Sequence, residues 1–234
     1  MHSPLEAACE GGNESIVTLL IDKGADVNKT TCYNSPLSAA CGGGNESIVT
    51  LLIEKGADVK KTTRYNSPLS AACNGGNQSI VTLLIDKGAD VNKTTKMYSP
   101  LISACDCGHL SIVTLLINKG AEVNQATDCN SPLASACQQG NKSIVALLID
   151  KGADVNQTAG GCSPLISAYN ESIVTLLFDK GADVDQTTGW NSPLTSACQR
   201  GNESIVTLLI EKGANVNKFT KMYSPLISAC ECGY

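Results

Sequence analysis

The sequence is poor in aromatic side chains, in basic side chains and in histidine. Aromatic residues make up 4% of the 234 residues, so a core must be built from smaller side chains. Lys and Arg number 17 against 22 Asp and Glu, which gives a net charge of −5. Because nucleic acids and anionic membrane surfaces bind through clustered Lys and Arg, this balance argues against both as partners.

Long apolar runs are also missing. No stretch approaches the roughly 18 consecutive apolar residues of a membrane-spanning helix, and the N-terminal segment MHSPLEAACEGG has no apolar signal-peptide region. We therefore predict no membrane insertion and a cytoplasmic location, in the reducing intracellular environment that suits free cysteines.

Residues suited to catalysis are scarce. There are 2 His, and no Gly-rich phosphate-binding motif follows a strand pattern. The carboxylates mostly recur at equivalent exposed positions, whereas a catalytic site needs one unique set of residues in a pocket. The sequence therefore predicts no enzymatic activity, no cofactor and no metal site.

What the sequence does contain is a repeated unit. Ser-Pro-Leu recurs every 32 residues, with one interval shortened to 29, which is the signature of a repeat array. Because such arrays grow by stacking equivalent units, we predict a single array over residues 1–234. Its copies span 3–34, 35–66, 67–98, 99–130, 131–162, 163–191, 192–223 and the partial 224–234.

The second copy shows the predicted layout of each unit. Ser35 and Pro36 supply an N-cap and a first-turn proline for a helix that ends at Gly42–Gly44. Asn45 is predicted to cap a second helix with apolar residues at helical spacing, and Gly56 to end it in a left-handed conformation. A polar connector then leads into the next copy.

Cysteine is unusually frequent, and seven of the 12 residues share one position in the copies. A Cys repeated at one position of the first helix is predicted to be a buried packing residue that behaves as a small hydrophobe. These residues are Cys9, Cys41, Cys73, Cys105, Cys137, Cys198 and Cys230.

The pattern CDCGH at Cys105–His109 could suggest a metal or nucleophile site. Residues two apart on a helix do not share a face, so Cys105 and Cys107 are expected to point apart. The spacing also differs from that of paired zinc ligands, and we predict no site there.

The unit SPLSAACGGGNESIVTLLIEKGADV resembles the ankyrin repeat, which reads TPLHxAAxxGHxxIVxLLLxxGADVN, and the match covers essentially the whole chain. The resemblance implies an all-α repeat solenoid with β-hairpin-like connecting loops. It also implies a curved stack whose concave face, made of loop tips and first helices, binds a protein partner of unknown identity. The alternatives are a structural spacer or tether, and a targeting segment of a larger protein whose activity lies elsewhere.

Two departures from the family pattern affect the loops. The His that follows TPL is absent from every copy, so a cross-link between this position and the loops is predicted to be missing. Connectors contain Gly only at Gly160, Gly161 and Gly189. This scarcity predicts that some loops are simple extended turns instead of regular hairpins.

The sixth copy lacks three residues at the end of its first helix and in the following turn. Either Tyr169 and Asn170 form a very tight turn, with Asn170 as a cap, or the two helices partly merge. Because three residues do not match the ~3.6-residue helical turn, we predict a kink or a weak joint near residues 165–175.

The copies differ most at the loop tips and at the end of the first helix. In arrays resembling ankyrin these positions contact partners, and Tyr, Trp, Met and Arg are enriched at interface centres. For Tyr98 and Tyr223, packing against the neighbouring helix is an equal alternative. The partner-binding candidates are Tyr33, Arg64, Tyr65, Lys96, Met97, Tyr98, Asp106, Gln138, Gln139, Trp190, Gln199, Arg200, Met222 and Tyr223.

The resemblance implies one modification as well. Asn in the context L-x₅-[DE]-V-N is often hydroxylated in this family, and the context occurs at Asn28, Asn92, Asn124 and Asn156. If the termini are native, the stacking faces at the two ends of the array would permit end-to-end self-association. The other explanation for the abrupt ends is that the chain is a segment of a longer protein.

Overall fold

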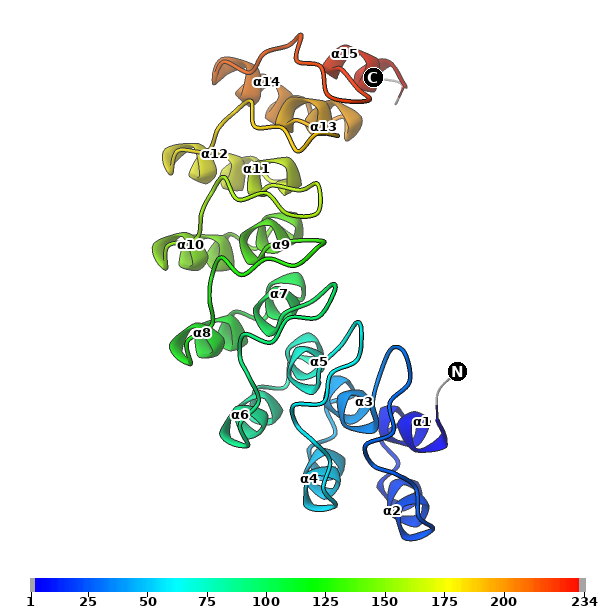
Figure 1. The fold of residues 1–234 in the computed structure, drawn as a ribbon. Coiled ribbons are helices and arrows are strands. Elements are labelled where there is room, and N and C mark those ends of the chain that lie inside the picture. Colours follow the sequence, from blue (N-terminus) through cyan, green and yellow to red (C-terminus); the bar gives the residue numbers. More distant parts are fainter. Residues whose placement is uncertain (1–2, 232–234) are drawn as a thin grey trace. The chain divides into compact units, whose positions relative to one another are not determined.

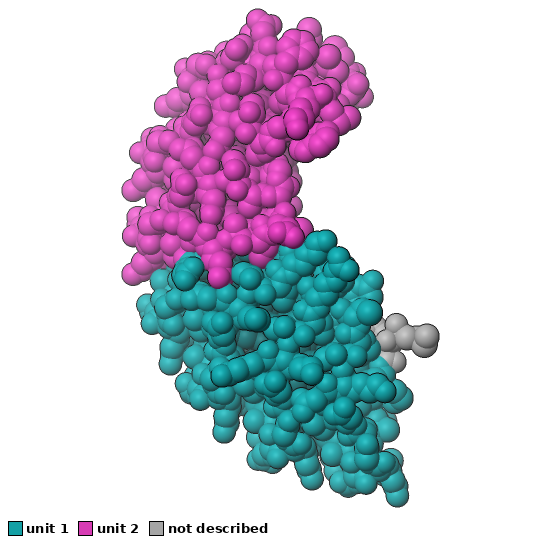
Figure 2. Space-filling model, in the orientation of Figure 1, with its two compact units in different colours: residues 1–122 teal, residues 123–234 magenta. Residues whose placement is uncertain are grey.

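The computed structural model describes residues 3–231, and the chain forms two compact units, Met1–Glu122 and Val123–Tyr234 (Figure 2). Regular structure within the described residues is helical, apart from one isolated bridge between Ala159 and Cys162. Nowhere in residues 3–231 is a helix both long enough and apolar enough to span a bilayer. The predicted all-α repeat solenoid is thus confirmed.

The first unit consists of four helix pairs (Figure 1). The first helices of the pairs pack on one another as one row, and the second helices form another row beside it. The first row is α1 (Pro4–Glu10), α3 (Pro36–Gly42), α5 (Pro68–Gly75) and α7 (Pro100–Asp106). The second row is α2 (Glu14–Asp22), α4 (Glu46–Glu54), α6 (Gln78–Asp86) and α8 (Leu110–Asn118).

The second unit repeats this arrangement, with one short helix. Its first row is α9 (Pro132–Gln139), α11 (Pro164–Ser167), α13 (Pro193–Gln199) and α15 (Pro225–Glu231). Its second row is α10 (Lys142–Asp150), α12 (Glu171–Asp179) and α14 (Glu203–Glu211). Residues 232–234 of the last copy lie outside the described residues.

Capping explains where the helices begin. Ser35 accepts a hydrogen bond from the backbone N–H of Ser38 at 3.1 Å, and the serine of each Ser-Pro pair makes the equivalent bond. Most second helices begin with a capping Asn, but Asn45 occupies its N-cap position without a side-chain capping bond. At the other end, Gly56 has a φ of 88°, which is the predicted left-handed C-terminal residue.

Cysteine fills the centre of the first row. Cys9, Cys41, Cys73, Cys105 and Cys137 are fully buried, as predicted. The prediction is wrong for two positions, since Cys198 is partly exposed and Cys230 is exposed. Cys198 lies on α13, which packs on the shortened α11, and Cys230 lies on α15, which has no second helix of its own copy among the described residues.

The buried thiols predict a loss of stability at alkaline pH. Burial raises the pKa of Cys9 to about 12, with a smaller contribution from Glu6, and it also raises the pKa of Cys41, Cys73 and Cys137. Because the folded chain holds these thiols protonated while the unfolded chain ionises them, the free energy of unfolding falls as pH rises above about 8.5, by up to ~1.4 kcal/mol per pH unit for each thiol.

Urea unfolding in a reducing buffer at about pH 8 and about pH 10 measures this loss. The variant Cys41→Ala is the control for other groups that titrate in this range, and it should lose less stability between the two pH values. The same loss in both proteins would contradict the assignment to buried thiols.

The loops are mostly simple turns. The N–H of Thr31 donates to the carbonyl of Asn34 at 2.9 Å, and the following loops repeat this closure. Only the loop containing Gly160 and Gly161 forms a reciprocal pair of bonds among residues 3–231, between Ala159 and Cys162 at 3.0 and 2.9 Å. Both glycines have positive φ there. This agrees with the prediction that Gly-poor connectors do not all form regular hairpins.

Other residues connect the loops in place of the missing His. The hydroxyl of Thr63 donates to the carbonyl of Tyr33 at 3.1 Å, and the hydroxyl of Thr95 donates to the carbonyl of Tyr65 at 3.2 Å. At the His position of the first copy, buried Glu6 accepts a bond from the hydroxyl of Thr31 at 3.4 Å. The loops are therefore tied both to one another and, in the first copy, to the helix row.

Candidate functional site

The first unit contains a groove between its loop tips and its first helices. The groove has a volume of about 510 Å³. Its floor is made of small residues on α3 and α5, including Ala39, Gly42 and Ala71, and its loop side carries three tyrosines, Tyr33, Tyr65 and Tyr98. We call this feature the tyrosine groove. It brings together three of the predicted partner-binding residues, from three successive loops.

The tyrosines of two neighbouring loops are held in a fixed row. The rings of Tyr33 and Tyr65 stack with centroids 5.4 Å apart and planes 14° apart. The guanidinium of Arg64 lies 5.4 Å from the centre of the Tyr65 ring. Tyr33 is 65% exposed, whereas Tyr65 is partly buried by its neighbours. The two rings therefore present aromatic surface in a defined conformation.

The third loop continues the row. The N–H of Lys96 donates to the carbonyl of Arg64 at 3.2 Å, which fixes the spacing of the second and third tips. Lys96 and Met97 are exposed, and Tyr98 is partly buried in the groove wall.

The second unit has a smaller aromatic tip. Trp190 is 55% exposed, and the ammonium of Lys221 lies 5.6 Å from its ring centre. The N–H of Lys221 donates to the carbonyl of Gly189 at 3.0 Å, so the two loop tips are joined. Met222 is also exposed, and Tyr223 is partly buried.

The predicted residues at the ends of first helices differ in their surroundings. Gln138 and Gln139 are exposed at the end of α9, while Asp106 and Gln199 are partly buried. Arg200 differs from all of these because its guanidinium is used inside the chain. It donates to the carbonyls of Ile166 and Ala168, at 2.9 and 3.4 Å, and lies 3.9 Å from the centre of the Tyr169 ring.

Arg200 occupies the space left by the three-residue deletion. In the second and third copies the equivalent residues are Gly43 and Gly75, and a Cβ on Gly75 would lie 2.7 Å from the carbonyl of Gly42. The backbone of this position therefore runs against the last carbonyls of the preceding first helix. In the seventh copy that preceding helix is α11, which ends a turn early at Ser167, and the long side chain reaches its carbonyls.

The sixth copy resolves the two alternatives left by its sequence. Ala168 has an extended conformation with ψ of 130°, and the side chain of Asn170 accepts a bond from the N–H of Ser172 at 2.8 Å. The tight turn with Asn170 as a cap is confirmed, and the merging of the two helices is wrong. Burial lowers the pKa of Arg200, against an opposing effect of Tyr169, as expected for a guanidinium enclosed in this joint.

The four predicted hydroxylation residues all join neighbouring copies. The Nδ2 of Asn28 donates to the carbonyl of Gly56 at 2.8 Å, and its Oδ1 accepts from the N–H of Asp58 at 2.8 Å. Equivalent pairs of bonds are made by Asn92, Asn124 and Asn156. We call each pair an asparagine clamp. Hydroxylation of these residues stays a prediction.

The CDCGH segment shows no converging ligands. Cys105 is buried, and the Sγ of Cys107 lies 3.1 Å from the Oδ1 of Asn74 in the preceding copy. The Nε2 of His109 lies 3.3 Å from the carbonyl of Asn74. Within residues 3–231 no cluster of three His, Cys, Asp or Glu side chains could hold a metal ion.

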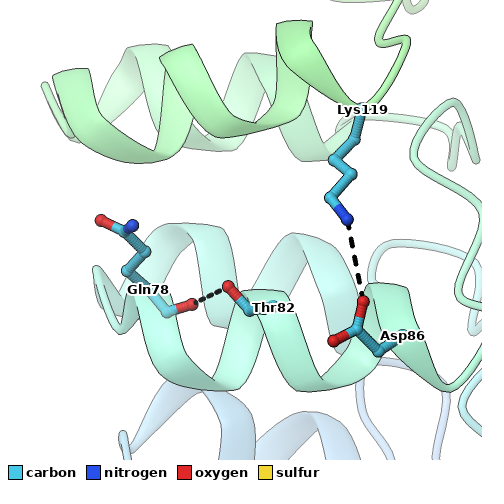
Figure 3. Close-up of polar contacts among 4 residues, drawn as sticks. All are labelled: Gln78, Thr82, Asp86 and Lys119. Carbon is cyan, nitrogen blue, oxygen red and sulfur yellow. Dashed lines mark hydrogen bonds and ion pairs between the residues drawn. The ribbon is translucent and has the colours of Figure 1, made fainter.

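The second-helix row carries ordinary exposed contacts (Figure 3). The hydroxyl of Thr82 bonds back to the carbonyl of Gln78 at 2.9 Å, and Lys119 pairs with Asp86 at 3.8 Å. Both charged side chains are more than two-fifths exposed, so this pair contributes little to stability. The repeated carboxylate position represented by Asp86 is thus part of a solvated face.

Helix pairs stacked in two rows, with a groove along loop tips and first helices, define a helical repeat array. Residues 2–63, 37–127, 124–188 and 167–234 match the family model described as ankyrin repeats (3 copies). The chain belongs to the ankyrin repeat family. Such repeats are generally protein-interaction modules without catalytic activity.

The fold is similar to that in the crystal structure of the human ASB11 ankyrin repeat domain. The TM-score is 0.58 and the sequence identity is 26%, over 97% of this chain and 92% of that chain. Comparison with curated proteins gives no match.

Sequence reasoning missed part of the groove. Asn34 and Asn66 line it, although no role in binding was predicted for them. Their place in the sequence could have indicated this role, because Asn34 and Asn66 each directly follow a loop-tip tyrosine. The role of Arg200 also had a signal, since it is the long cationic side chain at its position one copy after the deletion.

Proposed function

We propose that the chain is a non-catalytic scaffold that binds a protein partner through its loop tips and first helices. The observation that carries this proposal is the tyrosine groove, where one exposed and two partly exposed tyrosines border a floor of small residues. Aromatic residues set in a defined conformation lose little entropy on binding, and they are typical of interface hot spots.

We place the partner inside the cell. Every cysteine among residues 3–231 is a free thiol, including the exposed Cys32, Cys107 and Cys129. Free exposed thiols persist in reducing compartments, which supports a cytoplasmic site of action.

Tyr65→Ala is expected to weaken binding of a partner captured from native lysate by about 30-fold, which corresponds to ~2 kcal/mol for a hot-spot residue. The change removes the ring that stacks on Tyr33 and supports Arg64. Isothermal titration calorimetry with the purified partner gives the affinity, and Trp190→Ala tests the aromatic tip of the second unit in the same way.

Thr82→Ala is the matched control, because Thr82 is a partly exposed residue of the second-helix row, away from the loop tips, and its hydroxyl bonds back to the carbonyl of Gln78 within α6. It should bind like the unmodified chain. If both tip variants also bound with unchanged affinity, the groove proposal would fail and the spacer alternative would be favoured.

A further inference from the structure

The asparagine clamp is interrupted once, between the second and third copies. Lys60 occupies the position that Asn28, Asn92, Asn124 and Asn156 hold in other copies. Between the sixth and seventh copies Asp185 still supplies the acceptor, and its Oδ1 receives the N–H of Asn215 at 3.0 Å. At each of the other joints whose contacts the structure describes, a side-chain oxygen therefore accepts the N–H of the residue equivalent to Asn215.

The interruption leaves one backbone donor without its usual acceptor. Asp90 is the residue whose N–H corresponds to those of Asp58, Glu122 and Asp154, and it has no hydrogen-bond acceptor among residues 3–231. A lysine carries only donors, so Lys60 cannot replace the missing oxygen. Its side chain lies along Gly88 instead, with Cε 3.7 Å from where a Cβ of Gly88 would be.

A small cavity lies at the same joint, with a volume of about 140 Å³. Leu69 and Ala89 form apolar walls, Thr62 adds a hydroxyl, and Lys60 and Lys93 contribute two cations. Asp90 is the acidic residue of the lining, and its Oδ1 already accepts from the N–H of Asn92 at 2.9 Å. The lining therefore carries an excess of positive charge beside an unused N–H donor.

We propose that this cavity, the Lys60 pocket, binds a carboxylate from an Asp or Glu side chain of a partner protein. The carboxylate accepts the N–H of Asp90 in place of the missing Asn oxygen, and the ammonium groups of Lys60 and Lys93 flank it. Hydrogen bonds to a charged acceptor are stronger than neutral ones, which favours a carboxylate over an amide. The volume accommodates the carboxylate group of one acidic side chain.

The Lys60 pocket shares no lining residue with the tyrosine groove. It can therefore be tested without a partner, and its failure would leave the groove proposal standing. The probe is acetate, added to the full chain labelled with ¹⁵N and followed by NMR at constant ionic strength. Acetamide, which has the same shape without the charge, is the control ligand.

Acetate should shift the amide signal of Asp90 in a saturable way. The amides of Asp58, Glu122 and Asp154, whose acceptors are already present, should respond only in the weak linear manner of a general salt effect. An Asp90 response no different from these three, or an equal response to acetamide, would overturn the proposal.

Two variants distinguish the contribution of the Asp90 N–H donor from that of the lysine charges. Lys60→Asn recreates the sequence of the clamped copies, so the Asp90 amide should be occupied from within the chain and its response to acetate should disappear. Lys93→Gln keeps the free donor but removes one cation, and it should weaken acetate binding about tenfold. Unchanged acetate binding in either variant contradicts the pocket.

Discussion

Arg200→Ala is expected to lower the free energy of unfolding of the second unit by about 2–4 kcal/mol. The change removes the donor that satisfies the carbonyls of Ile166 and Ala168, and it removes the cation over the Tyr169 ring. A cation suits these carbonyls because they form the C-terminal end of a helix. Alanine would leave both carbonyls facing the gap made by the three-residue deletion.

Hydrogen exchange measures the effect where it should be greatest. Amides of residues 165–175 should exchange faster in Arg200→Ala, while those of the second and third copies should be unchanged. Arg200→Lys retains a charge but lacks the planar guanidinium that lies over the Tyr169 ring while its Nη1 donates to both carbonyls, so its exchange rates should fall between those of Arg200→Ala and the unmodified chain. Gln199→Ala, at the adjacent position, should change the free energy of unfolding by less than ~0.5 kcal/mol.

An unfolding free energy for Arg200→Ala within error of the unmodified chain would refute this assignment. Arg200 would then return to the candidates for partner contact, where its position at the end of a first helix placed it initially.

Gly160→Ala is expected to cost about 3 kcal/mol, because it combines two penalties. Gly160 has a φ of 59°, a conformation that costs an L-residue roughly 1 kcal/mol. A Cβ would also overlap the backbone carbonyl of Cys129 in the preceding loop, and such overpacking adds ~1–3 kcal/mol. The loop must therefore move away from its neighbour.

The adjacent Gly161 is the matched control. Its φ is 81°, but a Cβ there would meet nothing closer than the Trp190 ring at 3.9 Å. Gly161→Ala should therefore cost only the conformational penalty, about 1 kcal/mol. Chemical denaturation of both variants gives the comparison, and equal losses would show that the contact with Cys129 does not limit this position.

Much of the fold could be predicted because the determining features are local. Ser-Pro pairs fix the helix starts, glycines fix the ends, and the period of 32 residues assigns the same role to every copy. The buried cysteine row followed from the same periodicity. The predicted burial fails at Cys198, whose helix packs on the shortened α11, and at Cys230, whose copy has no second helix among the described residues.

The candidate site was predictable in position but not in geometry. Variation among the copies indicated the loop tips, yet the stacking of Tyr33 on Tyr65 depends on bonds between loops 30 residues apart. Arg200 was assigned to partner contact because its position varies. Its hydrogen-bond partners, Ile166 and Ala168, belong to the preceding copy, and an alignment of the copies does not show contacts between one copy and the next.

The joint at Arg200 also limits how this gene can be rearranged. Most copies begin with a complete first helix and do not need a side chain of the next copy to satisfy its last carbonyls. The sixth and seventh differ, because the shortened helix of one depends on a side chain carried by the other. Recombination between them would leave the truncated helix without its arginine, so the sixth and seventh copies, residues 163–223, must be transferred together.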